Sequence, residues 1–231
     1  MIEEILPTAV ASTEMFADPP DVALFPEEEL LVARAVDKRR REFTTARACA
    51  RSALARLGVE PAPILTGERG APGWPPGVVG SITHCAGYRA AAVAPARAVL
   101  TVGVDAEPDD PLPDGVLAVI SLPGERGRLA DLAGAAPGVN WDRLLFCAKE
   151  ATYKAWFPVA RRWLGFEDAD VTIDSANGTF LASLLVPAPA PLARLSGRWL
   201  ARDGLILTAI TVPASPGTDL QGSSSNAAWP T

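Results

Sequence analysis

The sequence predicts an α+β protein, because some stretches follow the residue spacing of a helix and others that of a strand. Apolar residues recur at three- and four-residue steps across residues 141–157, a spacing typical of an amphipathic helix. Apolar and polar residues alternate across residues 99–108, which indicates a strand with one apolar face. Asn177-Gly178 lies between two apolar runs, and this dipeptide favours the tight turn of an antiparallel hairpin. Helices and a small antiparallel sheet are therefore expected.

The first long helix is expected to begin at Pro26 and to end at Gly58. Proline suits the first turn of a helix, the three glutamates after it favour the positive end of the helix dipole, and glycine is common just after the last turn. A break is expected near Asp37. The central helix, residues 141–157, is expected to end at Pro158, because proline cannot continue the backbone hydrogen bonds.

The other expected elements share short apolar runs bounded by Gly, Pro, Asn or Asp. Strands are expected at residues 5–12, 64–66, 171–174, 179–186, 198–201 and 205–212, and within 78–93 as a pair joined by a turn at 86–87. Between the strand 99–108 and the central helix we expect only a short helix, residues 116–121, with loops on both sides. The tail, residues 213–231, is rich in Ser, Gly and Pro, so we expect it to be disordered.

Composition and charge set broad limits on function. The 231 residues are 48% hydrophobic, which is typical of a globular chain, and the net charge of −6 argues against bulk nucleic-acid binding. The three cysteines are scattered without a CxxC pair, so we expect reduced thiols and a cytoplasmic protein. No apolar run reaches the roughly 18–20 residues of a membrane helix, and the N-terminus lacks the basic start of a signal peptide. We therefore expect neither a membrane nor a nucleic acid as a partner.

Asp105 and Glu107 are two positions apart in the expected strand 99–108, so they share the face opposite its apolar side chains. Two carboxylates held side by side repel each other by about 1–4 kcal/mol, depending on the local dielectric. A bound cation would remove this cost, and ligands that are all oxygen suit Mg²⁺ or Mn²⁺. The alternative is a solvated strand end with two free acids.

The central helix contains Lys149-Glu150-x-x-x-Lys154. Glu150 and Lys154 are four positions apart and share a helix face, whereas Lys149 points a little to one side. A third carboxylate beside lysines would extend the metal site toward a phosphate. The alternative is a surface Glu–Lys pair worth roughly 0.2–0.5 kcal/mol.

The second half of the first long helix, residues 37–58, is strongly basic. Arg40, Arg47 and Arg51 occupy one narrow sector of the helical wheel, and Arg39 lies just beside it. Guanidinium groups match phosphate geometry through paired donors, so this face suggests an anion site in an acidic protein. A solvated charged face is the plainer interpretation, and nucleic acid would need a larger basic footprint.

His84 is the single histidine of the chain and lies beside Ser81 and Thr83 at an expected strand end. These small donors could hold a phosphate, although a lone histidine is more often structural. No second histidine or cysteine pair supports a zinc site. In the Gly/Pro-rich segment before this strand, Arg69 and Trp74 are the side chains that could touch a ligand, and Trp74 could instead cover the core.

Together these groups would bind a divalent metal, a pyrophosphate and at least one further phosphate, which suits phosphoryl transfer by positioning and charge neutralisation. The combination of Gly-Val-Asp-x-Glu with Lys-Glu-x-x-x-Lys resembles the 4'-phosphopantetheinyl transferases of the surfactin and enterobactin synthase type. The matching segments follow the family's order and span most of the chain, at residues 39–54, 67–75, 80–88, 102–108, 146–158 and 164–169.

The resemblance implies transfer of the phosphopantetheine arm of coenzyme A to a serine of an acyl or peptidyl carrier protein, with release of adenosine 3',5'-bisphosphate. It implies a pseudo-dimer of two similar α+β halves, residues 1–102 and 103–212, with coenzyme A and Mg²⁺ in the cleft between them. We expect the site to form within one chain, and hence a monomer. Carriers for fatty acid, polyketide, nonribosomal peptide or siderophore synthesis, antibiotic pathways included, are all compatible with it.

The resemblance also implies roles for the acids and lysines. Asp105, Glu107 and Glu150 would be the metal ligands, and Glu150 would also be the candidate base for the carrier serine, acting directly or through a metal-bound water. Lys154, and with it Lys149, would face the pyrophosphate.

The remaining contacts to coenzyme A are expected from the basic and hydroxyl side chains of the first half. These are Arg39, Arg47, Arg69, Ser81, Thr83 and His84. Helical geometry alone favours Arg40, so the choice between Arg39 and Arg40 stays open. A basic residue that the family often has near Thr66 is absent, and we expect Arg69 to substitute for it.

Two other functions stay open. A Mg²⁺-dependent nucleotide hydrolase would use the same acids with water as the nucleophile. A nucleotide-binding module without activity would use Glu150 and Lys154 as a structural ion pair.

Overall fold

In the computed structural model of the protein, residues 1–215 are described. They form two antiparallel sheets with helices packed on them, so the predicted mixture of α and β structure is confirmed. The expected disordered tail, residues 213–231, lies outside the described residues except for its first three.

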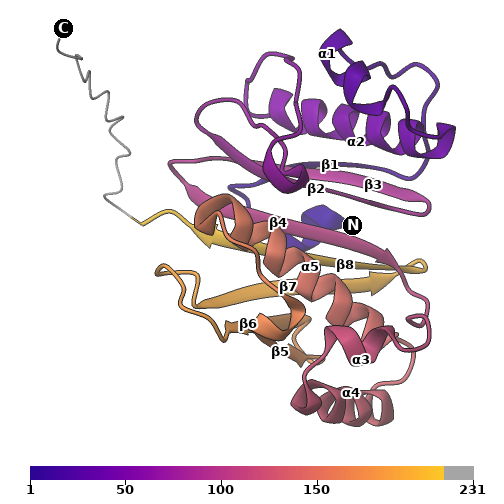
Figure 1. Ribbon diagram of the computed structural model, residues 1–231, viewed down its shortest axis with the longest axis vertical. Coiled ribbons are helices and arrows are strands. Elements are labelled where there is room, and N and C mark those ends of the chain that lie inside the picture. Colours follow the sequence, from indigo (N-terminus) through magenta and orange to yellow (C-terminus); the bar gives the residue numbers. More distant parts are fainter. Residues whose placement is uncertain (216–231) are drawn as a thin grey trace, which may run out of the picture.

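The N-terminal part of the chain builds a three-stranded sheet and the helices that cover it. Its elements are η1 (Ile2–Ile5), β1 (Ala11–Met15), α1 (Pro26–Glu29), η2 (Leu30–Val32), α2 (Asp37–Ala55), η3 (Glu68–Gly70), β2 (Val78–Cys85) and β3 (Tyr88–Pro95). The strands pair in the order β1-β3-β2, and α2 lies across one face of this sheet (Figure 1). Cys49, Ala50 and Ala53 of α2 pack with Ala91 and Val93 of β3 in one buried cluster, which fixes the helix on the sheet.

The C-terminal part builds a five-stranded sheet. Its elements are β4 (Val99–Pro108), α3 (Val116–Ile120), α4 (Pro123–Ala135), α5 (Trp141–Ala160), η4 (Phe166–Asp168), β5 (Ala169–Asp174), β6 (Thr179–Leu184), β7 (Arg194–Arg202) and β8 (Leu205–Pro213). The strands pair in the order β4-β8-β7-β6-β5, and α5 runs across one face (Figure 1). Gly103 of β4 permits this contact, since a Cβ there would lie 2.1 Å from the carbonyl oxygen of Ala151 in α5.

The two sheets meet along β2 and β4. Alanines of β3 share one buried core with Val104 of β4 and with apolar residues of β8. The backbone N–H of Val104 donates to Oγ of Ser81 at 3.1 Å, and that of Ala106 donates to Oγ1 of Thr83 at 3.0 Å. Hydroxyl groups of β2 therefore accept hydrogen bonds from backbone N–H groups of β4, along the edge of β4 that pairs with no other strand.

Several predicted boundaries are confirmed. The helical segment that begins at Pro26 breaks before Asp37, as expected. The turn between β5 and β6 contains Gly178 at φ 62°, and the turn between β7 and β8 has Asp203 at φ 54° and Gly204 at φ 75°. Asp203 and Gly204 thus have the two consecutive positive φ values of a tight two-residue hairpin turn, whereas the turn between β5 and β6 spans residues 175–178 and only its Gly178 is at positive φ.

The helix α4 was not predicted, because residues 122–140 were expected to form a loop. It begins at Pro123, and the side chain of Glu125 accepts a hydrogen bond from the backbone N–H of Leu122 at 2.7 Å. Glu125 is buried and forms an ion pair with Lys149 of α5 at 2.8 Å. A charged residue on the buried face of a helix hides the apolar spacing by which a helix is recognised.

The central helix was predicted to end at Pro158, but α5 continues to Ala160. Proline removes only the hydrogen bond from its own missing N–H, and the last turn is closed by the N–H of Arg161, which donates to the carbonyl of Phe157 at 3.0 Å. A proline in a final turn therefore did not terminate this helix.

Two expected strands are wrong or displaced. The first strand lies at Ala11–Met15 rather than at 5–12, and Ile2–Ile5 forms a 3₁₀ turn instead. Residues 64–66 form no strand, and only an isolated bridge joins Thr66 to Pro72. The backbone of Ile64 is satisfied by side chains, since its N–H donates to Glu28 and its carbonyl accepts from Arg47.

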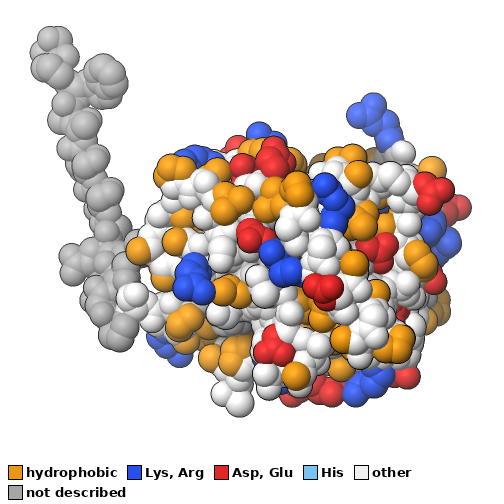
Figure 2. All heavy atoms as spheres, turned by 90° about the horizontal axis from the view of Figure 1, so that it is seen from below, with side chains coloured by type: hydrophobic (Ala, Val, Ile, Leu, Met, Phe, Trp, Pro, Cys, Tyr) orange, Lys and Arg blue, Asp and Glu red, His pale blue; other side chains and the backbone are white. Residues whose placement is uncertain are grey.

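The surface carries both signs of charge. On the face shown in Figure 2, the Lys and Arg side chains are interspersed with those of Asp and Glu and with apolar groups. Within residues 1–215, no helix combines the length and the apolar character that crossing a membrane requires.

Candidate active site

A cavity of about 710 Å³ lies between the basic helix α2, strand β2, the 66–74 loop and the helix α5. Its lining includes most of the charged residues that the sequence singled out, namely Arg39, Arg47, Arg69, His84, Glu150 and Lys154. Ser81 and Trp74 also line it. Residues far apart in the chain, from both sheets, therefore face one space of the size that small-molecule sites usually have.

Asp105 of β4 is buried beside Lys154 and, like Glu107, is not itself in the cavity lining. Its Oδ1 accepts hydrogen bonds from Nζ of Lys154 at 2.7 Å and from Oγ1 of Thr83 at 3.1 Å. Its Oδ2 is buried and has no hydrogen-bond partner among residues 1–215. A buried carboxylate oxygen without a partner is costly, so this half of Asp105 suits a bound cation.

Glu107 follows on the same side of β4 and is held by an arginine that the sequence did not single out. Nη1 of Arg143 donates to Oε2 of Glu107 at 3.1 Å, and the same guanidinium donates to the carbonyls of Asp110 and Pro111 at 3.0 Å each. Burial, and next the charge of Asp105, raise the pKa of Glu107 to about 6. Arg143 precedes Glu150 by seven positions in the sequence, which places both on one face of a helix. That spacing is the signal by which Arg143 could have been found.

Glu150 of α5 lines the cavity. Burial and the negative charge of Asp105 raise the pKa of Glu150, and Lys154 acts against them. Within residues 1–215, no three His, Cys, Asp or Glu side chains converge closely enough to form a metal cluster. Lys154 engages Oδ1 of Asp105 and Arg143 engages Oε2 of Glu107, so a metal would bind through the remaining oxygens, among them Oδ2 of Asp105. The pKa values of Glu107 and Glu150, both raised in part by the charge of Asp105, fit a site where a cation would relieve that repulsion.

Lys154 joins the acids to the cavity. Burial acts to lower the pKa of its ammonium, but the charge of Asp105 and the hydrogen bond to it outweigh burial and raise the pKa. Lys154 is therefore a positive group at the boundary between the carboxylates and the open space.

Lys149 lies elsewhere, contrary to the expectation that it faces the pyrophosphate. Its Nζ donates to the carbonyls of Phe166 at 2.7 Å and Ala169 at 3.0 Å, and it pairs with Oε2 of Glu125 at 2.8 Å. These partners use all three of its protons, and its side chain is only 2% exposed. Five positions separate it from Lys154, which places the two lysines on different sides of the helix.

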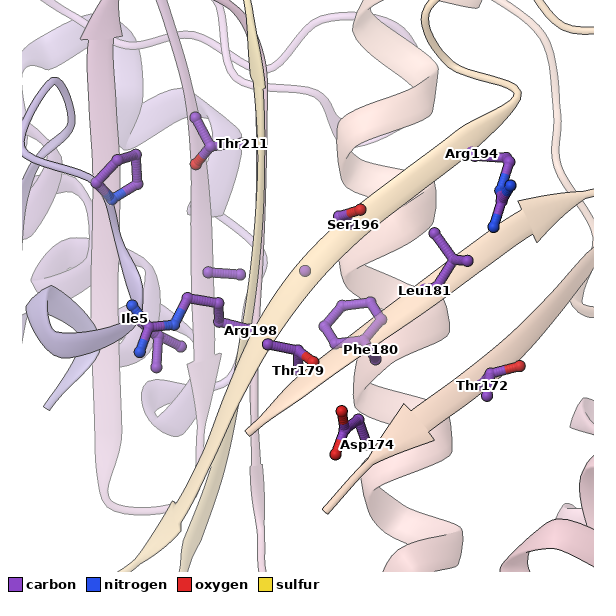
Figure 3. Close-up of a pocket in the computed structure, with 13 residues that line it drawn as sticks. Ile5, Thr172, Asp174, Thr179, Phe180, Leu181, Arg194, Ser196, Arg198 and Thr211 are labelled. Carbon is purple, nitrogen blue, oxygen red and sulfur yellow. The ribbon is translucent and has the colours of Figure 1, made fainter. Parts of the chain in front are cut away.

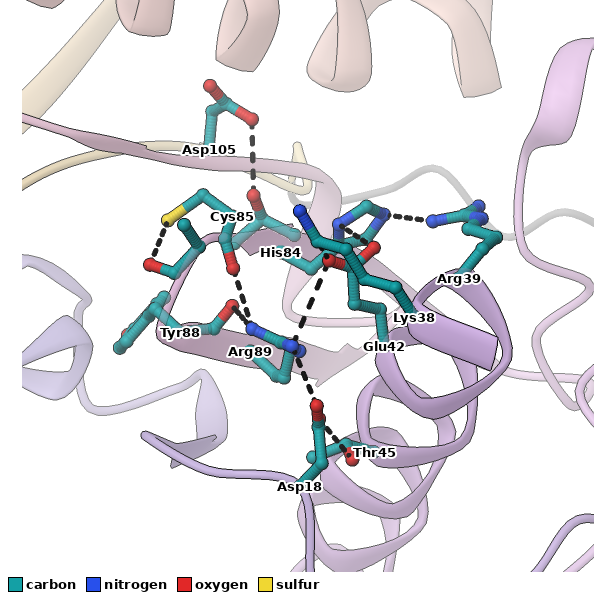
Figure 4. A network of polar contacts seen from close by, with 12 residues as sticks. Asp18, Lys38, Arg39, Glu42, Thr45, His84, Cys85, Tyr88, Arg89 and Asp105 are labelled. Carbon is teal, nitrogen blue, oxygen red and sulfur yellow. Dashed lines mark hydrogen bonds and ion pairs between the residues drawn. The ribbon is translucent and has the colours of Figure 1, made fainter. Parts of the chain in front are cut away.

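The basic end of the cavity holds Arg39, Arg47 and His84. Nη1 of Arg39 lies 2.5 Å from Nε2 of His84 (Figure 4). Nε of Arg47 donates to the carbonyl of Ile64 at 2.8 Å, and its guanidinium lies 4.3 Å from the centre of the Phe43 ring. Burial lowers the pKa of Arg47 to about 10, and burial followed by the charge of Arg39 lowers the pKa of His84.

The structure distinguishes Arg39 from Arg40. Arg40 forms an ion pair with Glu29 of α1, and Arg51 pairs with Glu28 at 2.9 Å. Arg39 lines the cavity, whereas Arg40 and Arg51 are not in its lining. Two of the three arginines in the helical-wheel sector that the sequence favoured, Arg40 and Arg51, therefore tie α2 to α1. Of that sector, Arg47 lines the cavity.

The two hydroxyl residues of β2 differ in position. Ser81 lines the cavity, and its Oγ accepts from the backbone of β4. Thr83 is not in the lining, since its Oγ1 donates to Asp105 and accepts from the N–H of Ala106. Thr83 thus orients a carboxylate instead of facing the open space.

Aromatic side chains border the cavity near its loop. Arg69, at φ 53°, lies with its guanidinium 5.3 Å from the Trp163 ring, which is itself 5.1 Å from the ring of Tyr153. Trp74 lines the wall, and its Nε1 donates to the carbonyl of Gly80 at 3.0 Å. Tyr153 and Trp163 were not singled out by the sequence, in which aromatic residues near a helix end are ordinary core candidates.

A second hollow of about 730 Å³ lies on the five-stranded sheet and the N-terminal turn (Figure 3). Its walls are alternating strand residues such as Thr172, Asp174, Arg194 and Ser196. This alternation is typical of the solvated face of an antiparallel sheet. The cavity beside Asp105 and Glu150 is therefore the better candidate for chemistry.

Comparison with known proteins identifies relatives along most of the chain. Residues 27–94 match the family model of the 4'-phosphopantetheinyl transferase N-terminal domain, and residues 101–202 match that of the 4'-phosphopantetheinyl transferase superfamily. The chain is 54% identical to 4'-phosphopantetheinyl transferase Svp of Streptomyces mobaraensis, over 94% of this chain and 92% of that protein. It is 52% identical to PptT of Mycobacterium tuberculosis (92% and 98%) and 55% identical to Npt of Nocardia iowensis (91% and 99%), both likewise 4'-phosphopantetheinyl transferases.

Proposed function

Because the chain belongs to the 4'-phosphopantetheinyl transferase superfamily, we propose that it transfers the 4'-phosphopantetheine arm of coenzyme A to a serine of an acyl or peptidyl carrier protein. Adenosine 3',5'-bisphosphate is the second product. The observation that carries this proposal is that a single cavity is lined by Glu150 and Lys154 of α5 together with Arg39, Arg47 and His84 of the first half. Several cationic side chains around one space suit a ligand with several phosphates.

The cavity is the proposed active-site cleft between two halves, residues 1–102 and 103–212, that form a pseudo-dimer of similar α+β units. Each half contributes a sheet with a long helix packed on it, α2 in the first and α5 in the second. The proposed junction falls within β4, so this strand connects the halves.

The acidic end would hold the metal, Mg²⁺ with Mn²⁺ as the alternative, through Asp105, Glu107 and Glu150. When bound there, the metal neutralises negative charge on the pyrophosphate. Thr83 keeps Asp105 in place through its hydrogen bond.

In the proposed reaction the serine oxygen of the carrier attacks the phosphorus that bears the pantetheine arm. The bond from that phosphorus to the bridging oxygen of the pyrophosphate breaks, and the adenosine bisphosphate departs with the electron pair. The carboxylate of Glu150 takes the serine proton, a role for which its raised pKa suits it. Lys154 stabilises the charge that develops on the departing phosphate.

The basic end would bind the remaining phosphates of coenzyme A. Arg39 and His84 supply adjacent nitrogens, and Arg47 is buried behind them with Nε already engaged. Arg69 lies near the aromatic border and would contribute a further positive charge. Lys149 has no part in this proposal, because its ammonium is engaged with Glu125 and two carbonyls.

Carrier proteins of polyketide, nonribosomal peptide, siderophore or fatty acid synthesis are the proposed partners, with neither nucleic acid nor membrane. The residues of the proposed site all come from one chain, which favours a monomer. The three free cysteines suit a reducing compartment, so we place the protein in the cytoplasm.

The test is intact mass spectrometry of an apo carrier protein incubated with the chain, coenzyme A and Mg²⁺. We expect a gain of one phosphopantetheine that is abolished by a chelator and by Glu150→Gln. Asp131→Asn is the matched control, since Asp131 is an exposed acid of α4 outside the cavity. Coenzyme A cleavage that is independent of a carrier would instead identify a hydrolase, and metal-independent binding without turnover would identify a binding module.

A further inference from the structure

A chain of charged side chains runs behind His84, between α2 and the hairpin of β2 and β3 (Figure 4). Oε2 of Glu42 lies 3.8 Å from Nδ1 of His84, and Oε1 of Glu42 lies 3.9 Å from Nη2 of Arg89. Arg89 in turn donates to Asp18 at 2.9 Å and to the carbonyls of the hairpin turn. Glu42 is thus a buried carboxylate held between a fixed arginine and the imidazole.

The contact on the other side of the ring determines where the imidazole proton lies. Nη1 of Arg39 is 2.5 Å from Nε2 of His84. A guanidinium can only donate hydrogen bonds, so Nε2 must accept. In the neutral ring the proton is therefore on Nδ1, which is the nitrogen that faces Glu42.

We propose that Glu42 is a positioning residue for the binding of coenzyme A: its negative charge, 3.8 Å from Nδ1 of His84, favours the proton on that nitrogen, so that Nε2 is directed at the cavity beside Arg39. This inference rests on the proposed function, because it assigns to Glu42 a part in binding the same phosphates.

The Glu42 carboxylate also favours the protonation of His84 that binding a phosphate would require. To donate to a phosphate, Nε2 must take up a proton, and the ring then carries a positive charge. The charged groups around His84 are Arg39 and Glu42 of α2, Arg89 of β3 and Lys154 of α5. Glu42 is the acid among them, so it alone in this group favours the charged ring.

A purely structural role for Glu42, as a partner of Arg89, makes different predictions. It would lower the amount of folded enzyme without changing the affinity of the folded fraction for coenzyme A. It would also leave the state of the His84 ring unaltered.

The experiment uses the full chain, purified without a histidine tag and labelled with ¹⁵N-histidine. His84 is the single histidine of the sequence, so one imidazole signal set reports on it directly. We expect the wild-type ring at high pH to show a protonated Nδ1 and an unprotonated Nε2, and to gain a proton when coenzyme A binds. A wild-type spectrum with the proton on Nε2 would overturn the proposal without any variant.

The variant is Glu42→Gln, which keeps the shape of the side chain and removes its charge. We expect His84 to become charged at lower pH, and the KM for coenzyme A to rise by about tenfold, the loss of roughly one charge-assisted contact, with kcat little changed. Glu42→Asp should restore part of this loss. Glu29→Gln is the control, since Glu29 pairs with Arg40 away from the cavity, and it should alter neither quantity.

The outcomes separate this proposal from the proposed function. If the chain modifies carriers but Glu42→Gln changes neither the titration of His84 nor the KM, the positioning role is wrong and the transferase stands. If no carrier is modified, but the variant weakens direct binding of coenzyme A and shifts the His84 titration, the positioning role stands and the transferase is wrong.

Discussion

The ammonium of Lys154 on α5 lies 2.7 Å from Oδ1 of Asp105 on β4, while Oδ2 of the same carboxylate is buried without a hydrogen-bond partner among residues 1–215. Lys154 and Thr83 therefore occupy one oxygen of the carboxylate, and the other oxygen is available for the proposed cation. The close packing of α5 on β4 at Gly103 makes this relationship possible.

Removal of the ammonium should slow turnover more than it weakens binding. Lys154→Met is expected to lower kcat by about 100-fold or more, since a charge aimed at the departing phosphate acts mainly in the transition state. The dissociation constant of coenzyme A, measured by calorimetry on the same variant, should change much less. An equal loss in kcat and in affinity would assign Lys154 to ground-state binding instead.

Binding of Mg²⁺ should stabilise the fold through Asp105. At a metal concentration about 100 times its dissociation constant, the gain in unfolding free energy is expected to be about 2.7 kcal/mol. The measurement is thermal unfolding with Mg²⁺ or with a chelator, in the absence of coenzyme A. Asp105→Asn should abolish the shift, whereas Asp131→Asn should keep it.

The metal-free protein should lose stability as the pH rises through the range that Glu107 titrates. Its pKa is raised from the ordinary 4.5 to about 6, so between these values the folded state binds a proton that the unfolded state has released. The contribution of Glu107 is thus most favourable below pH 4.5 and is lost as the pH passes 6. In urea unfolding with chelator, Glu107→Gln should raise stability relative to wild type more at pH 8 than at pH 5.

Lys149 and Lys154 should behave as different kinds of residue despite their shared motif. Lys149→Met leaves the buried Glu125 without its charged partner, and the cost is expected to be about 3–5 kcal/mol of unfolding free energy. The folded fraction should keep its KM for coenzyme A. The double variant Glu125→Gln with Lys149→Met removes the unpaired charge and keeps an acceptor for the backbone N–H groups of Leu122 and Val171, so it should recover much of the stability in urea unfolding. No recovery would mean that the unpaired charge is not the cause.

Gly103 should tolerate no side chain. In Gly103→Ala the new Cβ would meet the carbonyl oxygen of Ala151 at 2.1 Å, so α5 must move away from β4, at a cost of about 1–3 kcal/mol or more. Turnover of the folded enzyme should fall too, because Glu150 and Lys154 move with the helix. Gly127→Ala in α4 is the control, since nothing lies within 4 Å of its added Cβ, and it should stabilise slightly in thermal unfolding.

Local patterns in the sequence determined much of the secondary structure and the choice of candidate residues. Alternation along β4 placed Asp105 and Glu107 on one face, and helical spacing placed Glu150 and Lys154 together, because both periods are properties of the backbone. The positive-φ turn at Asp203 and Gly204 was equally local, since those residue types adopt that conformation at little cost.

The tertiary structure alone decided which partner each charged side chain meets. Lys149 and Lys154 belong to one motif, yet Glu125 engages the first and Asp105 the second. Arg40 pairs with Glu29 while Arg39 meets His84, and Arg143 and Glu42 became visible only through Glu107 and His84. The physical reason is range: backbone periodicity acts over a few residues, whereas an ion pair depends on which distant segments packing brings within about 4 Å.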